Sequence, residues 1–225
     1  MQQTIIKFKF KFKSNDFYIS NKNELAYKFI KSWPDWPTKI AYIYGSEKCG
    51  KTSICKLWMK LSKSIYVNKN NFLRRLIPQD NLDFIKSRNW IIDDVDHIIH
   101  FKKNKYEEKI LNLINIIKAS DKNFLLMTSK NTPKSLKSCL DDLISRLSSS
   151  TVIEMQDPDE DLLKKIIEKY LSERNVNISN ENLEYLINRI ERSYKSALMI
   201  AEKIDVKAME AKKKINKLFL NSIIN

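Results

Sequence analysis

The chain contains two glycines in 225 residues, and both lie within residues 44–52, which read YGSEKCGKT. Glycine is needed where a backbone turns tightly or must approach a ligand closely. The pair therefore indicates a geometrical demand in this segment that the rest of the chain does not share. The spacing is G-x-x-x-x-G-K-T, the P-loop pattern, in which backbone N–H groups surround phosphates.

The surroundings of this motif also favour a phosphate-binding loop. Residues 40–44 form a short apolar run typical of a buried strand, and residues 53–59 have the pattern of an amphipathic helix, so the helix N-terminus would face the phosphates. Lys51 is expected to reach the β- and γ-phosphates, and the Thr52 hydroxyl to ligate Mg²⁺. The alternative is a chance glycine turn before a helix. The residues expected to bind ADP or ATP here are Gly45, Ser46, Glu47, Lys48, Cys49, Gly50, Lys51, Thr52 and Ser53.

A second apolar run ends in carboxylates about forty residues later. Residues 89–96 read NWIIDDVD, which has the Walker B form. Asp93 is predicted to hold the water shell of Mg²⁺, and Asp94 to polarise an attacking water. Alone this pattern is a common way to end a strand, but its position after a complete P-loop strengthens the interpretation.

The remaining pattern alternates strands and helices and then becomes helical. Further strands are expected at residues 64–67, 90–92, 124–127 and 151–155, with a helix whose apolar face contains residues 110, 113, 114 and 117. This order predicts an α/β fold, a three-layer core with a parallel five-stranded sheet. Asp157 is expected to cap a helix that begins at Pro158. Helices starting near residues 158, 179, 193 and 212 predict a small all-helical lid over residues 156–225, after a core of residues 1–155.

Composition bears on partners and compartment. The net charge of +14 is compatible with nucleic-acid binding. However, the lysines are spread along the whole chain, and abundant Lys, Asn and Ile with scarce Gly and Arg are typical of A/T-rich coding. The three cysteines have no C-x-x-C spacing, and no apolar run approaches the ~20 residues needed to span a bilayer, so we expect a cytoplasmic protein without membrane contact. His97 and His100 lack further ligands at metal spacing, and a solvated or packed pair is the favoured interpretation.

Several motifs in this order resemble the DnaA-related AAA+ family, and within it the Hda-type regulators that inactivate the initiator DnaA, in their alphaproteobacterial form. The resemblance covers nearly the whole chain. It rests on FYISN at 17–21 with Leu25 and Ala26, WPDWP at 33–37, the P-loop, IDD at 92–94, Thr128-Ser129 with Pro133, and SRL at 145–147. It implies an AAA+ core with a helical lid that binds ADP or ATP with Mg²⁺. It also implies that Arg146 is an arginine finger acting in trans, although an exposed cation is the alternative for this residue alone.

The resemblance also implies partners, and the chain differs from the family's pattern at some positions. The partners would be DnaA and the DNA-loaded sliding clamp of DNA polymerase III, with DNA contacted indirectly, and a homodimer is an alternative to a monomer. The family's sensor 1 acid corresponds to Lys130, and its sensor 2 arginine to Lys195, which keeps the charge but loses the bidentate fork. These departures favour weak or absent intrinsic ATPase activity. The clamp-binding segment keeps Gln3, Ile6 and Phe8 in outline, while the alternation of Lys and Phe over residues 7–13 equally fits an edge strand.

The sequence is also compatible with other classes of function. A DnaA initiator would need a helix-turn-helix domain beyond residue 225. A DnaC-type helicase loader would need an extension before the core, and 44 residues precede Gly45. A small-molecule P-loop kinase would use the helices as a substrate lid, and another DNA-associated AAA+ ATPase would bind bare DNA with steep salt dependence.

Overall fold

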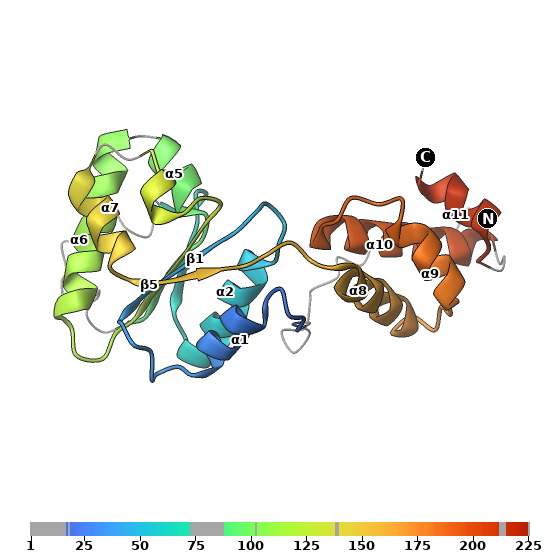
Figure 1. The fold of residues 1–225 in the computed structure, drawn as a ribbon, viewed down its shortest axis with the longest axis horizontal. Coiled ribbons are helices and arrows are strands. Elements are labelled where there is room, and N and C mark those ends of the chain that lie inside the picture. The colour runs from blue at the N-terminus through green and yellow to red at the C-terminus, as the bar shows by residue number, and fades with distance from the viewer. Residues whose placement is uncertain are drawn as a thin grey trace, which may run out of the picture.

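The computed structural model describes residues 17, 19–72, 88–101, 103–137, 140–211 and 215–224. The expected clamp-binding residues Gln3, Ile6 and Phe8 lie outside this part of the chain. The described residues form an α/β part and a helical part that lie end to end, joined by the segment that follows the last strand (Figure 1). Within the described part, every helix is too short or too polar to cross a membrane.

A parallel five-stranded sheet forms the centre of the α/β part. Its strands are β1 (Ile40–Tyr44), β2 (Ile65–Val67), β3 (Trp90–Ile92), β4 (Leu125–Ser129) and β5 (Thr151–Glu154). The order across the sheet is β2-β3-β4-β1-β5, and all four pairings are parallel. The carboxyl ends of β1, β3 and β4 therefore meet at one edge, where the P-loop, the Asp93-Asp94 pair and Lys130 follow their strands. In such sheets, ligands bind at this edge.

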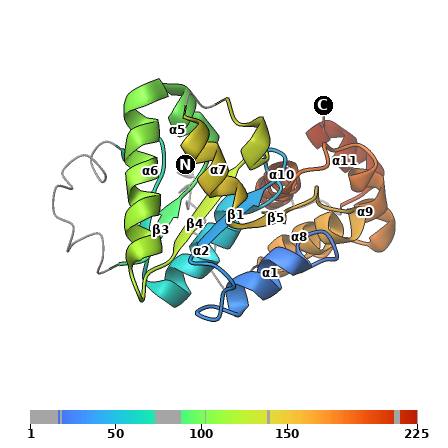
Figure 2. The same ribbon diagram turned by 60° about the vertical axis from the view of Figure 1, so that its left-hand side comes forward.

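Helices cover both faces of the sheet, which confirms the expected three layers (Figure 2). One face packs against α1 (Glu24–Lys31) and α2 (Lys51–Ser62). The other packs against α5 (Val95–Phe101), α6 (Lys103–Ala119) and α7 (Asp141–Ser148), and a short 3₁₀ turn η1 (Pro133–Ser135) precedes α7. Alternate residues of β1 serve the two cores, because successive strand side chains point to opposite faces. The apolar face predicted for residues 110, 113, 114 and 117 is buried on α6.

The WPDWP segment closes the end of the sheet away from the P-loop. The ring of Trp36 is stacked between Phe29 and Trp58, with centroids 4.5 and 4.9 Å away, and Phe124 meets it edge-on just before β4. Its indole Nε1–H donates to the Phe29 carbonyl over 2.9 Å, so its polar group is satisfied although the residue is buried. The segment is therefore a structural anchor of α1 and α2.

The helical part contains α8 (Glu160–Ser172), α9 (Asn180–Ile187), α10 (Tyr194–Ala211) and α11 (Lys217–Ile224), which share a core of their own. The predicted cap of α8 is wrong: Asp159, not Asp157, is the N-cap, and its carboxylate accepts from the Leu162 N–H over 2.8 Å. Asp157 is used differently, since its carboxylate accepts from the Ser46 hydroxyl in the P-loop. The last helix begins at Lys217 and not near residue 212. The boundary at residues 155/156 stays a prediction.

Candidate functional site

The two glycines of the P-loop are needed for two different structural reasons, a close backbone contact at Gly45 and a positive φ at Gly50. A Cβ atom on Gly45 would lie 2.1 Å from the Met155 carbonyl oxygen, so the residue after β5 leaves no space for a side chain there. Gly50 has φ +108°, a conformation that L-residues rarely adopt, and it caps the start of α2. Lys48 is also left-handed, with φ 66°. The loop is thus shaped by close approach at its start and by backbone conformation at its end.

The side chain of Lys51 lies inside this loop. Its Nζ donates to the carbonyl of Gly45 over 2.8 Å and to that of Ser46 over 2.6 Å, and the residue is 6% exposed. A buried ammonium needs acceptors, and here two backbone carbonyls supply them. The positive charge of Lys51 therefore lies at the centre of the loop, where the P-loop motif predicts that phosphates bind.

Asp93 is the centre of a buried hydrogen-bond cluster. Its Oδ2 accepts from the Thr52 hydroxyl over 2.8 Å and from the Tyr66 hydroxyl. Its Oδ1 accepts from the Thr128 hydroxyl over 2.5 Å and has the Cys55 thiol 3.7 Å away. Burial, followed by the charge of Asp93, raises the pKa of Tyr66, and the same two causes raise the pKa of Cys55. Both groups therefore remain protonated donors to the carboxylate.

Asp94 has a different environment from its neighbour. It adopts φ 57°, its backbone N–H donates to the Thr128 hydroxyl oxygen over 3.0 Å, and its carbonyl accepts from the first turn of α5. This unusual conformation aims the half-buried side chain into a cavity beside the P-loop. Burial, and then the charge of Asp93, raise the pKa of Asp94.

The cavity beside the P-loop has a volume of about 410 Å³ and lies between the α/β part and α10. The P-loop and α2 contribute Glu47, Lys48, Gly50, Lys51, Thr52 and Ser53. The other lining residues are Asp94, His97, Lys130, Tyr194, Lys195 and Leu198. The structure thus brings together most of the predicted phosphate-binding residues with Asp94, Lys130 and Lys195. Gly45, Ser46 and Cys49 belong to the loop but do not line the cavity.

The start of α10 is attached directly to the P-loop. The Tyr194 N–H donates to the Lys48 carbonyl over 3.3 Å, and Asn23 donates to the Tyr194 hydroxyl over 3.4 Å. The Lys48 ammonium pairs with the Glu191 carboxylate at 3.2 Å. This pairing, together with a hydrogen bond from Ser196, lowers the pKa of Glu191. We call the contacts of Lys48 with Glu191 and Tyr194 the lid contact.

Lys130 follows β4 and faces the same cavity. Its backbone N–H donates to Asp96 Oδ2 over 3.2 Å, which fixes the turn at α5. Its Nζ lies 3.9 Å from a carboxylate oxygen of Glu47, and both side chains are more than half exposed. The Lys130 ammonium is therefore only weakly paired, and its side chain lines the cavity.

The carboxylate of Asp93 fits poorly the predicted role in holding Mg²⁺. A carboxylate offers about four acceptor positions, and four protein groups already surround its oxygens. Waters of a magnesium ion would have to displace one of these donors. The Thr52 hydroxyl, which donates to Asp93, still has lone pairs directed elsewhere. The chain's residues thus provide a hydroxyl but no free Asp93 oxygen for the ion.

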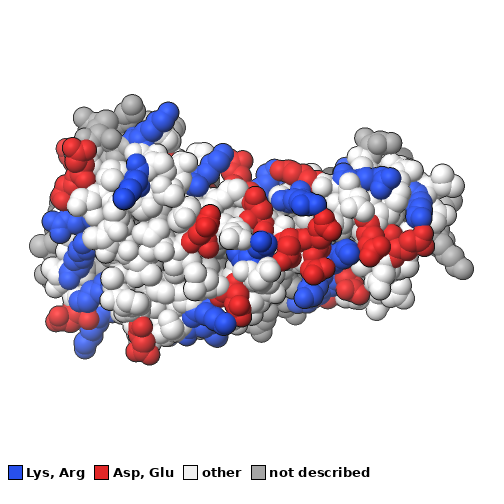
Figure 3. All heavy atoms as spheres, viewed as in Figure 1, with Lys and Arg blue, Asp and Glu red and all other residues white. Residues whose placement is uncertain are grey.

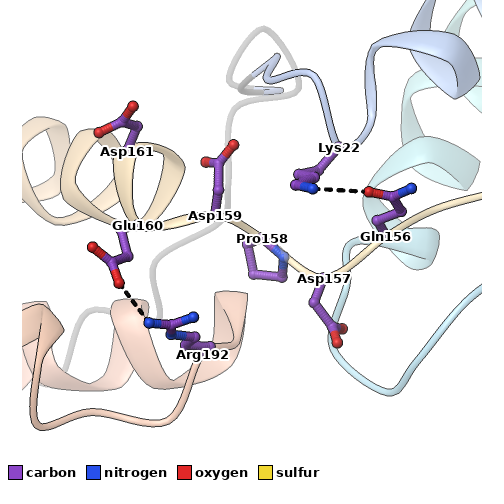
Figure 4. A pocket seen from close by; sticks show the side chains of 8 residues that line it. All are labelled: Lys22, Gln156, Asp157, Pro158, Asp159, Glu160, Asp161 and Arg192. Atoms are coloured by element: carbon purple, nitrogen blue, oxygen red, sulfur yellow. Dashed lines mark hydrogen bonds and ion pairs between the residues drawn. The ribbon is translucent and has the colours of Figure 1, made fainter.

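A larger cavity of about 670 Å³ lies beside the linker between β5 and α8, whose residues form part of its lining (Figure 4). Its lining includes four carboxylates, from Asp157, Asp159, Glu160 and Asp161, against two cations, from Lys22 and Arg192. Lys22 donates to Gln156, and Arg192 pairs with Glu160. Acidic walls repel phosphate, so the smaller cavity, which is lined by four lysines, is the better candidate for phosphate binding.

Arg146 lies outside both cavities. It is on α7, its side chain is 42% exposed, and its Nε lies 3.2 Å from Asp142 on the same helix. His97 lines the smaller cavity, whereas His100 is exposed on the same helix. Among the described residues, no group of three or more His, Cys, Asp or Glu side chains could hold a metal ion.

Sequence patterns did not identify several residues of the site. Tyr66 and Thr128 reach Asp93 from β2 and β4, and only the strand order of the sheet brings them together. Glu191 lies 143 residues beyond Lys48, its partner in the P-loop, and Tyr194 follows it on the same segment. The signal that could have identified Tyr194 is its position directly before Lys195, at the start of a helix.

Comparisons with known proteins agree with this architecture. A family model described as the bacterial DnaA ATPase domain matches residues 7–154. The chain is 30% identical over 203 residues to the chromosomal replication initiator protein DnaA of Campylobacter jejuni, which covers 82% of this chain and 45% of that protein. It is 25% identical over 223 residues to an uncharacterised Haemophilus influenzae protein, covering 93% of this chain and 92% of the other.

Solved structures share the same fold. Domain III of the Thermotoga maritima replication initiation protein DnaA matches with a TM-score of 0.78 and 19% identity, over 94% of this chain and 96% of that one. The AMPPCP-bound DnaA of Aquifex aeolicus matches with a TM-score of 0.75 and 22% identity, over 89% of this chain and 67% of that one. The chain thus spans about half the length of the initiator sequence that it matches and nearly all of the isolated domain.

Proposed function

The chain belongs to the family of bacterial DnaA ATPase domains, and we propose that it is a nucleotide-binding AAA+ regulator of replication initiation. In this proposal it acts together with the DNA-loaded sliding clamp and stimulates hydrolysis of the ATP bound to DnaA. The initiator protein would then be left in its ADP form. The reasons are the arrangement of the P-loop cavity and the position of Arg146.

The smaller cavity is the proposed site for ADP or ATP. Lys51 lies at the centre of the loop below it, and Lys195 lines it from α10 above. The N-terminus of α2 and the backbone N–H groups of the loop favour anions at the same place. A DnaA relative of the same fold is described with AMPPCP bound, which supports a nucleotide as the ligand. Within this site, Asp94 is the carboxylate proposed to activate a water.

The observation that carries the proposal is the position of Arg146. Its guanidinium is exposed on α7, pairs with Asp142 on the same helix, and does not line the chain's own cavity. An arginine in this position cannot stabilise phosphates bound to its own P-loop. It is available to a nucleotide on a second AAA+ protein, where an arginine in trans accelerates hydrolysis by roughly 10³–10⁵. We propose DnaA as that second protein.

The proposal makes DNA contact indirect. On the face shown in Figure 3, basic and acidic side chains are interspersed over both parts of the molecule. Such a mixed surface gives weaker attraction to a phosphate backbone than a continuous basic patch. Contact with DNA would then come through the clamp, for which Gln3, Ile6 and Phe8 are the proposed binding residues. The free chain is proposed as a monomer or, alternatively, as a homodimer that covers Arg146.

The test is hydrolysis of ATP by DnaA with the clamp loaded on DNA. We expect stimulation by the wild-type chain, loss of at least ~10³-fold of that stimulation in Arg146→Ala, and little stimulation when the clamp is omitted. The matched control is Arg189→Ala, because Arg189 is an exposed arginine of the helical part that stacks on Tyr185. This variant should behave as wild type.

The outcomes separate the parts of the proposal. Stimulation of hydrolysis without the clamp would exclude a role for the clamp but would still be compatible with Arg146 as the arginine finger. Equal stimulation by wild type and Arg146→Ala would exclude the arginine finger. Phosphorylation of a small acceptor in place of DnaA-dependent hydrolysis would favour the P-loop kinase alternative.

A further inference from the structure

We propose that Lys130, and not a magnesium ion held by Asp93, supplies much of the positive charge at the terminal phosphates of the bound nucleotide. As a consequence, this chain binds ATP and ADP with little dependence on Mg²⁺. The inference rests on the proposed function only in that the smaller cavity takes nucleotide phosphates. It adds a specificity-determining residue and a metal dependence to that site.

The first reason is the saturation of Asp93. Thr52 and Tyr66 occupy one carboxylate oxygen, and Thr128 and Cys55 occupy the other. The residue is only 3% exposed, so little of its surface is open to a hydration shell. Mg²⁺ keeps several waters when it binds to proteins and needs carboxylates to accept from them. Here, binding those waters would break contacts that are already buried and satisfied.

The second reason is the excess of cations in the cavity. Four lysines line it, from the P-loop, the turn after β4, and α10, against the carboxylates of Glu47 and Asp94. Lys48 pairs with Glu191, whereas Lys51 donates to uncharged backbone carbonyls and Lys130 is only weakly paired with Glu47. The charges of Lys51 and Lys130, together with that of Lys195, are therefore available to a ligand. Lysine binds phosphate as a compact point charge. Three such charges from three separate elements can neutralise a polyphosphate without a metal ion.

The third reason is that the backbone of Lys130 is fixed while its ammonium is weakly held. Asp96 accepts from its backbone N–H, and the buried Tyr42 hydroxyl donates to the carbonyl of the next residue, Asn131, over 2.9 Å. The Nζ itself is 3.9 Å from Glu47, in a pair with both side chains exposed. A phosphate group that enters the cavity can therefore replace Glu47 as the partner of the Lys130 ammonium with little loss of free energy, because exposed ion pairs are weak.

The experiment measures the Kd of ATP and of ADP for the full chain by isothermal titration calorimetry, with excess Mg²⁺ and with EDTA. The wild-type Kd should change by less than ~3-fold between the two buffers. In Lys130→Ala, binding should weaken by about tenfold or more in both buffers, which is the usual effect of losing a charged hydrogen bond, because no magnesium ion on Asp93 replaces the lost charge. Lys134→Ala is the matched control, since Lys134 is exposed one turn later and does not line the cavity.

A second variant tests the saturation of Asp93. Tyr66→Phe removes one donor and frees an acceptor position, so Mg²⁺ should now tighten binding more than it does in the wild type. A wild-type Kd that rises tenfold or more in EDTA would overturn the inference and leave nucleotide binding intact. Equal Kd values for Lys130→Ala and Lys134→Ala in EDTA would also overturn it. Absence of nucleotide binding in both buffers would overturn the proposed function itself.

Discussion

Gly45 lies against the backbone of Met155, the residue that follows β5. The Met155 carbonyl oxygen occupies the position that a Cβ atom would need. Gly45→Ala must therefore displace backbone, and we expect a loss of about 2 kcal/mol or more in the free energy of unfolding. Urea denaturation measures it, with Ser46→Ala as the neighbouring control, where the change should stay within about 1 kcal/mol. Equal stability of the two variants would contradict the close approach.

Asp94 gives a prediction for stability against pH. Its pKa is raised in the folded chain by burial and by Asp93, so the folded state binds more protons than the unfolded state between the ordinary carboxyl pKa of 3.8 and the raised value. Stability from this residue therefore falls as pH rises through that window.

Asp94→Asn removes the ionisation and retains a residue that tolerates positive φ. The variant should be more stable than wild type at neutral pH, because the ionised carboxylate that burial disfavours is absent. The difference should shrink as pH falls toward 3.8. Thermal unfolding over a pH series measures this trend, and a difference that grows on acidification would exclude the assigned cause.

The sequence could predict the site only where the chemistry is local. The P-loop and the Asp93-Asp94 pair are contiguous motifs, and the structure places Lys51, Thr52 and Asp94 around one cavity. The Tyr66 and Thr128 hydroxyls were not predictable, because they reach Asp93 only through the pairing of β2, β3 and β4. A single hydroxyl in a strand has no sequence signal that gives its partner.

Between elements, the lid contact determines how α10 meets the P-loop. Glu191→Gln removes the ion pair with Lys48 but keeps the shape of the side chain. Because exposed ion pairs are weak, we expect nucleotide release to accelerate by only roughly 1.5–5-fold. The effect should decrease at high salt, which screens exposed charges. Stopped-flow release of a fluorescent ADP analogue measures it.

The control for this prediction lies within the helical part. Glu184→Gln breaks a comparable pair, in which the Lys164 ammonium lies 3.4 Å from Glu184, but on helices away from the P-loop. It should leave nucleotide release unchanged. If both variants accelerate release equally, the lid contact does not control the nucleotide.

Element boundaries show where sequence reasoning lost precision. The five strands followed from short apolar runs and the apolar face of α6 from periodicity, and both are properties of neighbouring residues. The start of α8 did not, because Asp157 and Asp159 are equally good caps in isolation. The difference between them is a contact distant in sequence. The Asp157 carboxylate accepts from the Ser46 hydroxyl in the P-loop, whereas the Asp159 carboxylate accepts from the Leu162 N–H and caps the helix.

At the scale of the whole molecule, the proposed nucleotide lies between the α/β part and α10, while Arg146 lies on α7, among the helices of one face of the sheet. The chain would thus hold one nucleotide in its own cavity and present an arginine to a second nucleotide elsewhere. The central claim of this account is that the second nucleotide belongs to DnaA.

The most direct measurement follows a label on that second nucleotide. DnaA is loaded with radiolabelled ATP and freed of excess, and then mixed with clamp on DNA and with this chain carrying unlabelled nucleotide. We predict rapid appearance of labelled ADP on DnaA, and no such appearance with Arg146→Ala. Labelled ATP that persists on DnaA while the unlabelled nucleotide of this chain is hydrolysed would contradict the account, because Arg146 would then have no partner site on the initiator.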